Sequence, residues 1–326
     1  MNISSIRKIF LSIMLSLLSL NIFAKELTVM SFNIQGHGPN SSNHRFGNDN
    51  WENQLISAID QSKADIVLLQ EVPLMGVQNN ISQTFLNKMS KKKSSWKSIT
   101  SGVYSISNRD LNNAVLYNEA KVILQEDFAK KQPFNMAAYK LNPSIDDRRF
   151  KFSVNNEQIL EFSIRNSDLH FYVVNVHLPG PNEKEKLYEE RRVIEELYAY
   201  CKRKLPVIIG GDFNHSRKDL IRGSNFGDAI IDGKEGIYID VWGQKSTVTE
   251  DNNSFKLKND FDHFIINPKN IFSVSEQMHL VFSKNKIESF SKLKIGRAIY
   301  TDSKSYHEGL SDHLPIMIKL SYNIEK

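Results

Sequence analysis

Six short polar motifs, each beside an apolar run, constrain the fold of this chain more than any other feature of its sequence. The apolar runs have the character of buried strands, and each motif places Asn, Glu, Asp or His at the end of such a run. A sheet-based fold uses polar groups at the ends of several strands to assemble a site at one edge. The motifs are, in chain order, Ser31-Phe32-Asn33, Leu69-Gln70-Glu71, Val174-Asn175-Val176-His177, Gly210-Gly211-Asp212-Phe213-Asn214, Phe261-Asp262-His263 and Ser311-Asp312-His313.

The carboxylates of these motifs predict a cation at the shared edge. Glu71, Asp212, Asp262 and Asp312 would repel one another if they were gathered without a counter-charge. Hydrolysis of a phosphodiester near neutral pH needs a metal ion that polarises the phosphoryl oxygen, an activated water and stabilisation of the charge on the phosphorus. The motifs offer candidates for each need, so the pattern favours a metal-dependent phosphoester hydrolase.

Length and composition favour a single large domain. The chain has 326 residues, of which 40% are hydrophobic, and this is enough to bury one large core. Sheet-rich enzymes often fill such a length as one domain. We therefore expect one domain over residues 25–326.

The first 24 residues have the layout of a secretory signal peptide. Arg7 and Lys8 precede an apolar stretch from Ile9 to Phe23, and Ala24 stands where cleavage is expected. An uncleaved membrane anchor is the weaker alternative, because the stretch is shorter than the roughly 20 residues that a bilayer needs. No other long apolar segment follows. We therefore expect a secreted protein, periplasmic or extracellular, that has no transmembrane anchor after processing.

Charge and cysteine content give weaker evidence about function than the motifs do. Cleavage would remove two of the 42 Lys and Arg residues and none of the 37 Asp and Glu residues, which leaves a net charge of +3. This excess is too small to indicate nucleic acid by itself. Cys201 is the single cysteine, so it cannot form an internal disulfide. A half-buried thiol is the favoured interpretation, and an intermolecular bridge and a reactive thiol stay open.

Hydrophobic spacing predicts strands that alternate with helices in two successive halves of the chain. Such an order is typical of an α/β fold in which two packed sheets are flanked by helices. The polar segment 35–50 is expected to be a loop, and 126–157 an excursion of loops and short strands. The predicted strands are 27–34, 64–69, 113–117, 122–124, 159–164, 171–176 and 205–209, and the predicted helices are 51–62, 81–89 and 183–201.

The ordered series of motifs, from Leu27 to Lys319, resembles the endonuclease/exonuclease/phosphatase superfamily. This superfamily includes DNase I, abasic-site nucleases, sphingomyelinases and inositol-phosphate phosphatases. The resemblance implies a DNase I-like four-layer sandwich. It also implies that Glu71, Asp312 and Asn33 hold Mg²⁺, with Mn²⁺ or Ca²⁺ as alternative ions.

The same resemblance implies catalytic roles for five further residues. Asp262 would orient the imidazole of His313 as an acid/base pair, and Asp212 would contact or activate the attacking water. Asn214 would donate to the phosphate. His177 would bind the opposite phosphoryl oxygen or protonate the leaving group. His263 stands next to Asp262, and we expect it to serve packing or to face solvent instead of taking part in catalysis.

Three local details are similar to the B subunit of cytolethal distending toxin, a secreted bacterial nuclease. Asn33-Ile34-Gln35-Gly36 is similar to the Asn-Leu-Gln-Gly of that branch, and the following polar loop ends in Trp51. Gly211-Asp212-Phe213-Asn214-His215-Ser216 is followed by Asp219-Leu220. This branch implies DNA as the substrate, together with carrier or delivery subunits as partners.

Two departures from the nuclease pattern keep other substrates open. Nucleases of this superfamily usually carry an arginine on the strand before the His177 strand, where this chain has Glu161, and the 126–157 excursion is longer than expected. Arg109 is then the better candidate for a phosphate contact. The enzyme alternative is a phosphoinositide phosphatase or a sphingomyelinase-like phosphodiesterase. A catalytically silent binding module is a third alternative, and the retention of the acidic motif positions argues against it.

Overall fold

The computed structural model describes most of the sequence that carries the motifs. The predicted signal peptide, the 126–157 excursion, Arg109 and Asp312 lie outside the described residues, so the expectations for them stay predictions. The described residues are 25–34, 49–73, 83–91, 95–100, 111–125, 158–180, 184–221, 247–251, 254–267, 271–283, 286–290, 298–300, 311 and 313–322.

The larger of two main sheets has seven strands. Its members are β1 (Lys25–Asn33), β2 (Ile66–Pro73), β3 (Trp96–Thr100), β4 (Leu111–Asn118), β12 (Phe272–Ser283), β13 (Lys286–Phe290) and β15 (Ile316–Tyr322). Their spatial order is β13-β12-β15-β1-β2-β4-β3. β1 runs parallel to β2 and antiparallel to β15, so β1 and β2 end at the edge where β15 begins.

The second main sheet has five strands in the order β11-β8-β7-β6-β5. Its members are β5 (Val122–Leu124), β6 (Gln158–Ile164), β7 (His170–His177), β8 (Val207–Asp212) and β11 (Asp262–Asn267). β7 and β8 are parallel, while β11 is antiparallel to β8. A third, three-stranded sheet contains β9 (Thr247–Asp251), β10 (Ser254–Asn259) and β14 (Ala298–Tyr300).

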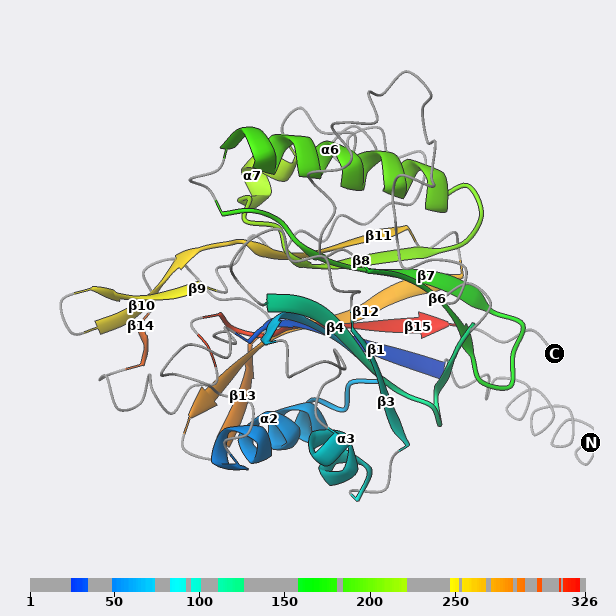
Figure 1. The fold of residues 1–326 in the computed structure, drawn as a ribbon, viewed down its shortest axis with the longest axis horizontal. Coiled ribbons are helices and arrows are strands. Elements are labelled where there is room, and N and C mark those ends of the chain that lie inside the picture. The colour runs from blue at the N-terminus through cyan, green and yellow to red at the C-terminus, as the bar shows by residue number, and fades with distance from the viewer. Residues whose placement is uncertain are drawn as a thin grey trace, which may run out of the picture.

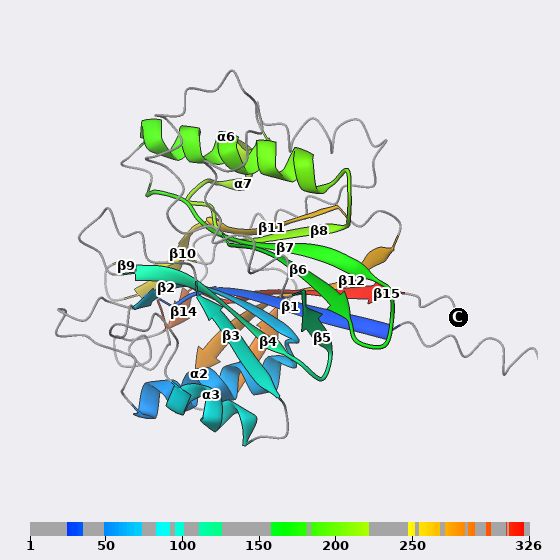
Figure 2. The ribbon, with the colours of Figure 1, turned by 45° about the vertical axis from the view of Figure 1, so that its right-hand side comes forward.

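The two main sheets pack face to face, and helices cover their outer faces (Figure 1, Figure 2). The helices are α2 (Asp49–Ser62), α3 (Gln83–Ser90), α6 (Lys184–Cys201) and α7 (Arg217–Ile221). α2 and α3 lie on the seven-stranded sheet, and α6 and α7 lie on the five-stranded sheet. This arrangement confirms the predicted four-layer α/β sandwich. Within the described residues, no helix is long and apolar enough to cross a membrane.

The central strands are buried on both faces, which explains their nearly continuous apolar sequence. Successive side chains of a strand point to opposite faces, so β1 sends Val29 into the core between the sheets and Met30 into the core beneath α2 and α3. β2 does the same with Leu68 and Leu69. Because neither face meets water, such strands show no alternation of apolar and polar residues.

Two of the motifs lie at strand starts, which corrects the expectation that every motif closes its strand. Asp262 is the first residue of β11, and His313 precedes β15 by three residues. Asp262 pairs with Asp212, the last residue of β8. An antiparallel neighbour must begin at the edge where the preceding strand ends, so these two motifs still reach the same edge as the others.

β8 continues through two glycines to Asp212, beyond the predicted end at residue 209. A Cβ at Gly210 would lie 2.5 Å from the Phe264 ring, so the glycine permits close contact with β11. Gly211 has a φ of 152°, and a Cβ there would lie 1.9 Å from the Val176 carbonyl oxygen. Glycine is required at this position because its backbone conformation and its space both exclude a side chain.

Candidate active site

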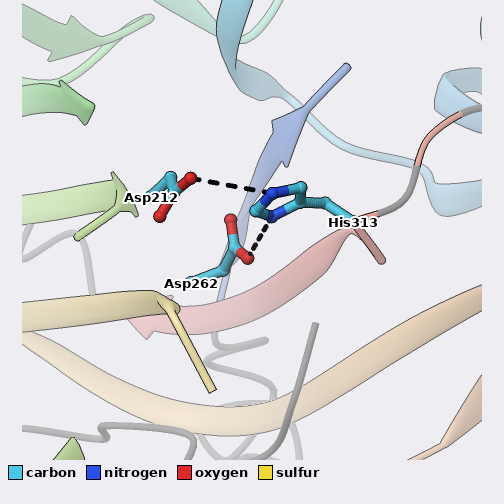
Figure 3. Close-up of side chains that lie close together, drawn as sticks. All are labelled: Asp212, Asp262 and His313. Carbon is cyan, nitrogen blue, oxygen red and sulfur yellow. Dashed lines mark hydrogen bonds and ion pairs between the residues drawn. The ribbon is translucent and has the colours of Figure 1, made fainter. Parts of the chain in front are cut away.

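Six of the predicted site residues meet at one end of the sandwich. The seven-stranded side provides Asn33 at the end of β1 and Glu71 near the end of β2. The five-stranded side provides His177 at the end of β7 and Asp212 at the end of β8. Asp262 and His313 complete the group from the starts of β11 and β15, and Figure 3 shows that the His313 ring interacts with both Asp212 and Asp262.

Asn33 connects the two halves of the site. Its side chain is fully buried, and its Nδ2 lies 3.1 Å from Glu71 Oε1 and 3.1 Å from Asp212 Oδ2. The same nitrogen is 3.5 Å from His313 Nε2. An amide nitrogen donates two hydrogens and carries no charge, so Asn33 holds the two carboxylates close together without neutralising them.

Asp262 and His313 form a tight buried pair. His313 Nδ1 lies 2.7 Å from Asp262 Oδ2, and the two side chains are 9% and 1% exposed (Figure 3). The Asp262 carboxylate accepts the Nδ1–H bond, and this fixes the ring orientation and the tautomer. The backbone N–H of His313 also donates to Ser311 Oγ at 3.1 Å. The second nitrogen, Nε2, therefore points toward Asp212 Oδ2 at 3.7 Å.

Asp212 is a buried carboxylate with a raised pKa. Burial is the main cause of the increase, and the charge of Asp262 adds to it. His313, His177 and the backbone N–H of Asn214, which donates to Asp212 Oδ1 at 2.8 Å, act in the opposite direction. A carboxylate with a raised pKa holds a proton more readily, which suits a group that receives one during a reaction.

Glu71 reaches the site through an irregularity in β2. Between Leu69 and Val72 the strand carries one residue more than its neighbour β4, and Glu71 adopts a φ of 55°. Such a left-handed conformation costs a non-glycine residue about 1 to 3 kcal/mol, and a bulge of this kind redirects a side chain. Glu71 Oε1 consequently lies 3.7 Å from His177 Nε2, which is 3.8 Å from Asp212 Oδ2.

Asn214 also adopts a left-handed conformation, with a φ of 49°. Its Nδ2 donates to the carbonyl oxygen of Leu178 at 2.7 Å, so the residue after β8 is tied to the residue after β7. The amide nitrogen carries two hydrogens. One serves this bond, and the other is chemically suited to a substrate oxygen.

A pair of buried amides behind the site had no role in the sequence predictions. Gln70 Nε2 donates to Asn175 Oδ1 at 2.7 Å, across the two sheets. Asn175 Nδ2 lies 3.0 Å from the carbonyl oxygens of Leu69 and Ala114. These bonds hold β7 against the bulge that presents Glu71. The available signal was an amide side chain inside an otherwise apolar run, one residue before Glu71 and two before His177.

The donor set fits a hard divalent cation at Glu71 and Asn33. Glu71, at 24%, is more exposed than Asp212 and Asp262, the other described carboxylates of the site, and Mg²⁺ is usually bound by one or two carboxylates that leave room for water. Asp212, Asp262 and His313 also offer donor atoms within 4.8 Å of one another. A cation held by His313 Nδ1 would break its bond to Asp262, whereas the side-chain oxygens of Glu71 and Asn33 are hard donors of the kind that Mg²⁺ prefers.

Glu161 lies away from the active site. The prediction that this acidic residue stands in place of a phosphate-binding arginine is therefore wrong. It pairs across the sheet with Tyr172, five residues before His177, so about 17 Å of strand separates the two positions. Glu161 Oε1 instead lies 2.8 Å from His170 Nδ1. Gln158 pairs with Asn175, so the residue opposite His177 precedes the described part of β6.

Two other predictions concern residues outside the cluster. His263 serves packing, as expected: it is fully buried, and its Nε2 lies 2.8 Å from the His215 carbonyl oxygen.

Cys201 is 2% exposed, and burial raises the pKa of its thiol to about 12. It is therefore more deeply buried than predicted, and a protonated thiol is a poor nucleophile.

Several solved structures have a fold similar to that of this chain. The zebrafish (D. rerio) TDP2 complexed with single strand DNA product is 14% identical over 91% of this chain and 99% of that chain, with a TM-score of 0.53. An endonuclease/exonuclease/phosphatase family protein from Bacteroides thetaiotaomicron is 18% identical, with a TM-score of 0.53. The match covers 93% of this chain and 97% of that protein. The mannosyl-6-phosphatase Bt3783 of that organism is 18% identical, with a TM-score of 0.50. The match covers 91% of this chain and 100% of that protein.

At these identities the likeness establishes the fold alone. No curated protein sequence matches the chain. Residues 30–313, which contain all six motifs, match the model of the Endonuclease/Exonuclease/phosphatase family. Members of this family are phosphoester hydrolases that generally depend on a divalent metal ion, and the clustered acidic and His side chains agree with that chemistry. The chain belongs to the endonuclease/exonuclease/phosphatase family.

Proposed function

We propose that the protein is a secreted, Mg²⁺-dependent phosphodiesterase that hydrolyses DNA, of the cytolethal distending toxin B type. The observation that carries this proposal is the Asp262–His313 pair, whose Nε2 faces Asp212 across 3.7 Å. This gap is too long for a direct hydrogen bond, and one water oxygen could contact both groups. The attacking water would contact both groups, beside Asn33 Nδ2, which lies 3.1 Å from Asp212 Oδ2 and 3.5 Å from His313 Nε2.

The residues of the five-stranded side, together with His313 from the start of β15, would bind and transfer the protons. Asp212 would orient the attacking water by accepting a hydrogen bond from it, His313 Nε2 would take the proton, and Asp262 would stabilise the imidazolium that forms. His177 is 20% exposed and lies beside both Glu71 and Asp212, where it would bind a phosphoryl oxygen or protonate the leaving oxygen. Asn214 would donate its second N–H to the phosphate.

The residues of the seven-stranded side would bind the cation. Glu71 and Asn33, together with the predicted ligand Asp312, would hold Mg²⁺, and Mn²⁺ or Ca²⁺ are the alternative ions. The bound ion would polarise the phosphoryl oxygen and stabilise the negative charge of the transition state. Asn33 would keep Glu71 beside Asp212, because its one nitrogen contacts both carboxylates.

DNA is the proposed substrate for three reasons. The motif sequences around Asn33 and Asp212 are similar to those of the toxin nucleases. Glu161 lies away from the site, so it does not disfavour a phosphate backbone there. A TDP2 of similar fold is complexed with a single-stranded DNA product, which supports a nucleic-acid substrate for this scaffold. Carrier or delivery subunits belong to the same proposal.

A plasmid-nicking assay with and without EDTA tests the reaction, beside an assay of phosphate release from a phosphoinositide. We expect nicking that EDTA abolishes, no phosphate release, and no nicking by Asp262→Asn. Nicking that survives EDTA would contradict the metal requirement. Phosphate release without nicking would assign the site to the phosphoinositide alternative, and a protein that does neither would fit a silent binding module.

Secretion needs its own test. Expression of the whole chain in a bacterium with a secretory pathway should yield a protein outside the cytoplasm whose first residue is Lys25. Recovery of the uncleaved chain in the membrane fraction would contradict the predicted signal peptide.

A further inference from the structure

Tyr188 is an exposed aromatic side chain at the same end of the molecule as the active site. It lies in the second turn of α6 and is 52% exposed. Two other large hydrophobic side chains among the described residues are exposed, Ile123 at 38% and Ile271 at 39%. Ile123 pairs with Ser163, which pairs with the first residue of β7, and Ile271 precedes the strand position that pairs with Tyr322. Both isoleucines therefore lie at the end away from the site.

Neighbouring side chains hold the Tyr188 ring in place. The Arg191 guanidinium carbon lies 5.1 Å from the ring centroid, and the His215 ring centroid is 5.6 Å away. Arg191 is itself fixed, because its Nη1 donates to the Asp219 carbonyl oxygen at 3.3 Å and its Nε lies 3.3 Å from Glu195 Oε1. A ring fixed before binding loses little conformational entropy when a ligand packs on it.

The cation beside this ring is Arg191 and not His215. Burial lowers the pKa of His215 to about 4, and the charge of Arg191 adds to that effect. His215 is therefore neutral near pH 7 and acts as a second flat ring next to Tyr188. An exposed aromatic ring that carries a guanidinium nearby offers a stacking surface and a positive field together, which is the combination that binds single-stranded nucleic acids.

Short connections place Tyr188 beside the catalytic residues. His215 follows Asp212 by three residues, so their Cα atoms lie at most about 11 Å apart. Asn214, next to His215, is bonded to Leu178, the residue after His177. Figure 1 shows α7 and one end of α6 above the ends of β7 and β8. The Tyr188 ring contacts His215, three residues after Asp212, so it is close enough for a base near the attacked phosphate to reach it.

We propose that Tyr188 is a nucleobase-stacking subsite, which binds a base a few nucleotides from the phosphodiester that is cleaved. This inference rests on the proposed function and deepens it, since it requires a substrate longer than a single phosphate group. A small head group bound at Asp212 and Glu71 would not reach the ring. The subsite would accept any base, because every base has an aromatic face.

The test compares Tyr188→Ala with Tyr188→Phe on a short and a long substrate. The short substrate is the p-nitrophenyl ester of thymidine 5′-monophosphate, and the long one is a single-stranded oligonucleotide of about 12 nucleotides. Tyr188→Ala should raise KM for the long substrate about 5-fold to 100-fold and leave kcat unchanged. It should leave both constants unchanged for the short substrate, which also reports correct folding. Tyr188→Phe keeps the ring and should retain the wild-type KM, as should the control Ile271→Ala.

Abasic substitutions locate the base that stacks. Removal of one base from the oligonucleotide should raise KM for the wild type at one or two positions, and Tyr188→Ala should be insensitive at those positions. Equal KM values for wild type and Tyr188→Ala on the long substrate would overturn the subsite. A uniform rise in KM at every length would assign Tyr188 to general packing instead and would also overturn it.

Direct binding separates a failure of this inference from a failure of the proposed function. Fluorescence anisotropy of a labelled oligonucleotide in EDTA measures affinity without hydrolysis. If the wild type binds and Tyr188→Ala binds about 5-fold or more weakly, the subsite stands even when no cleavage occurs. If both bind equally, the subsite is wrong although cleavage is retained. If the wild type does not bind the single-stranded oligonucleotide, the subsite is wrong, and the plasmid-nicking assay decides separately whether DNA is the substrate.

Discussion

The two sheets contribute different chemistry to the same site. The seven-stranded side presents a partly exposed carboxylate, Glu71, beside the neutral amide of Asn33. The five-stranded side presents Asp212 and Asp262, which are 3% and 1% exposed and lie near imidazoles. Exposure leaves room for an ion and its waters, whereas burial shifts proton affinity. The difference favours cation binding on the seven-stranded side and proton transfer on the five-stranded side, to which His313 is added from the start of β15.

Loss of a proton-handling residue should give the largest effects. His313→Ala and His177→Ala should each lower kcat about 10²-fold to 10⁴-fold, because a positioned acid or base is lost. Substrate affinity, measured by anisotropy, should change much less. Normal turnover by either variant would remove that histidine from the chemistry. His263→Gln is the control for these two variants, because His263 lies beside Asp262 but serves packing.

The cation-binding half should respond to metal concentration. Glu71→Gln and Asp312→Asn should each lower the rate about 10²-fold or more, because each removes anionic charge at nearly constant size. Raising the Mg²⁺ concentration should restore part of the activity of Glu71→Gln and none of that of Asp262→Asn. If Mg²⁺ restored the activity of both variants equally, the proposed division between cation-binding and proton-handling residues would be wrong. Wild-type rates in Glu71→Gln would contradict the metal assignment itself.

Buried histidines outside the site make stability depend on pH. Burial, with a smaller contribution from His263, lowers the pKa of His279 to about 3 from 6.5. The unfolded chain takes up a proton below pH 6.5 while the folded protein does not, so this stabilisation is complete above pH 6.5 and is lost as the pH falls toward about 3. The expected loss is a few kcal/mol. Urea unfolding at several pH values should show it, and His279→Leu should flatten the profile.

The buried amides behind the bulge should matter for stability and for Glu71. Asn175→Ala leaves the carbonyl oxygens of Leu69 and Ala114 without this donor, which should cost about 1 to 3 kcal/mol each in the free energy of unfolding. The Mg²⁺ concentration for half-maximal activity should rise as well, because Glu71 follows the bulge. Asn87→Ala, an exposed asparagine on α3, should change neither quantity. A destabilised variant with normal Mg²⁺ dependence would limit Asn175 to a packing role.

The smallest predicted effect concerns Arg109. If Arg109 contacts a phosphate of the DNA backbone, Arg109→Ala should reduce the slope of log affinity against log salt by about one between about 50 and 200 mM salt. An unchanged slope would show that Arg109 makes no such contact. Salt-independent affinity in the wild type would contradict binding along a DNA backbone and favour a single head group.

Much of this fold could be predicted from local patterns in the sequence. β1, β2, β7 and β8 are buried on both faces, so each appears as a continuous apolar run that ends in a polar residue. The amphipathic spacing of α2 and α6 predicted both helices to within two residues at each end. These features depend on neighbours along the chain, which a single sequence records directly.

Features that depend on pairing between distant segments could not be predicted in the same way. Asp262 and His313 were expected at strand ends, and they lie at strand starts because β11 and β15 are antiparallel to their neighbours. The left-handed φ of Glu71 results from a bulge against β4, which local sequence does not specify. The Gln70–Asn175 bond depends on how the sheets dock, so each amide appeared only as a polar residue in an apolar run.

The position of Asn33 has a consequence for how activity arises during folding. Its bond to Asp212, like the bond of His313 to Asp262, joins a residue of one sheet to a residue of the other. Either sheet formed alone would contain half of the polar groups and no competent arrangement of them. The first molecule to turn over substrate must therefore already have docked its sheets, so the rate of appearance of activity on refolding measures the docking step directly.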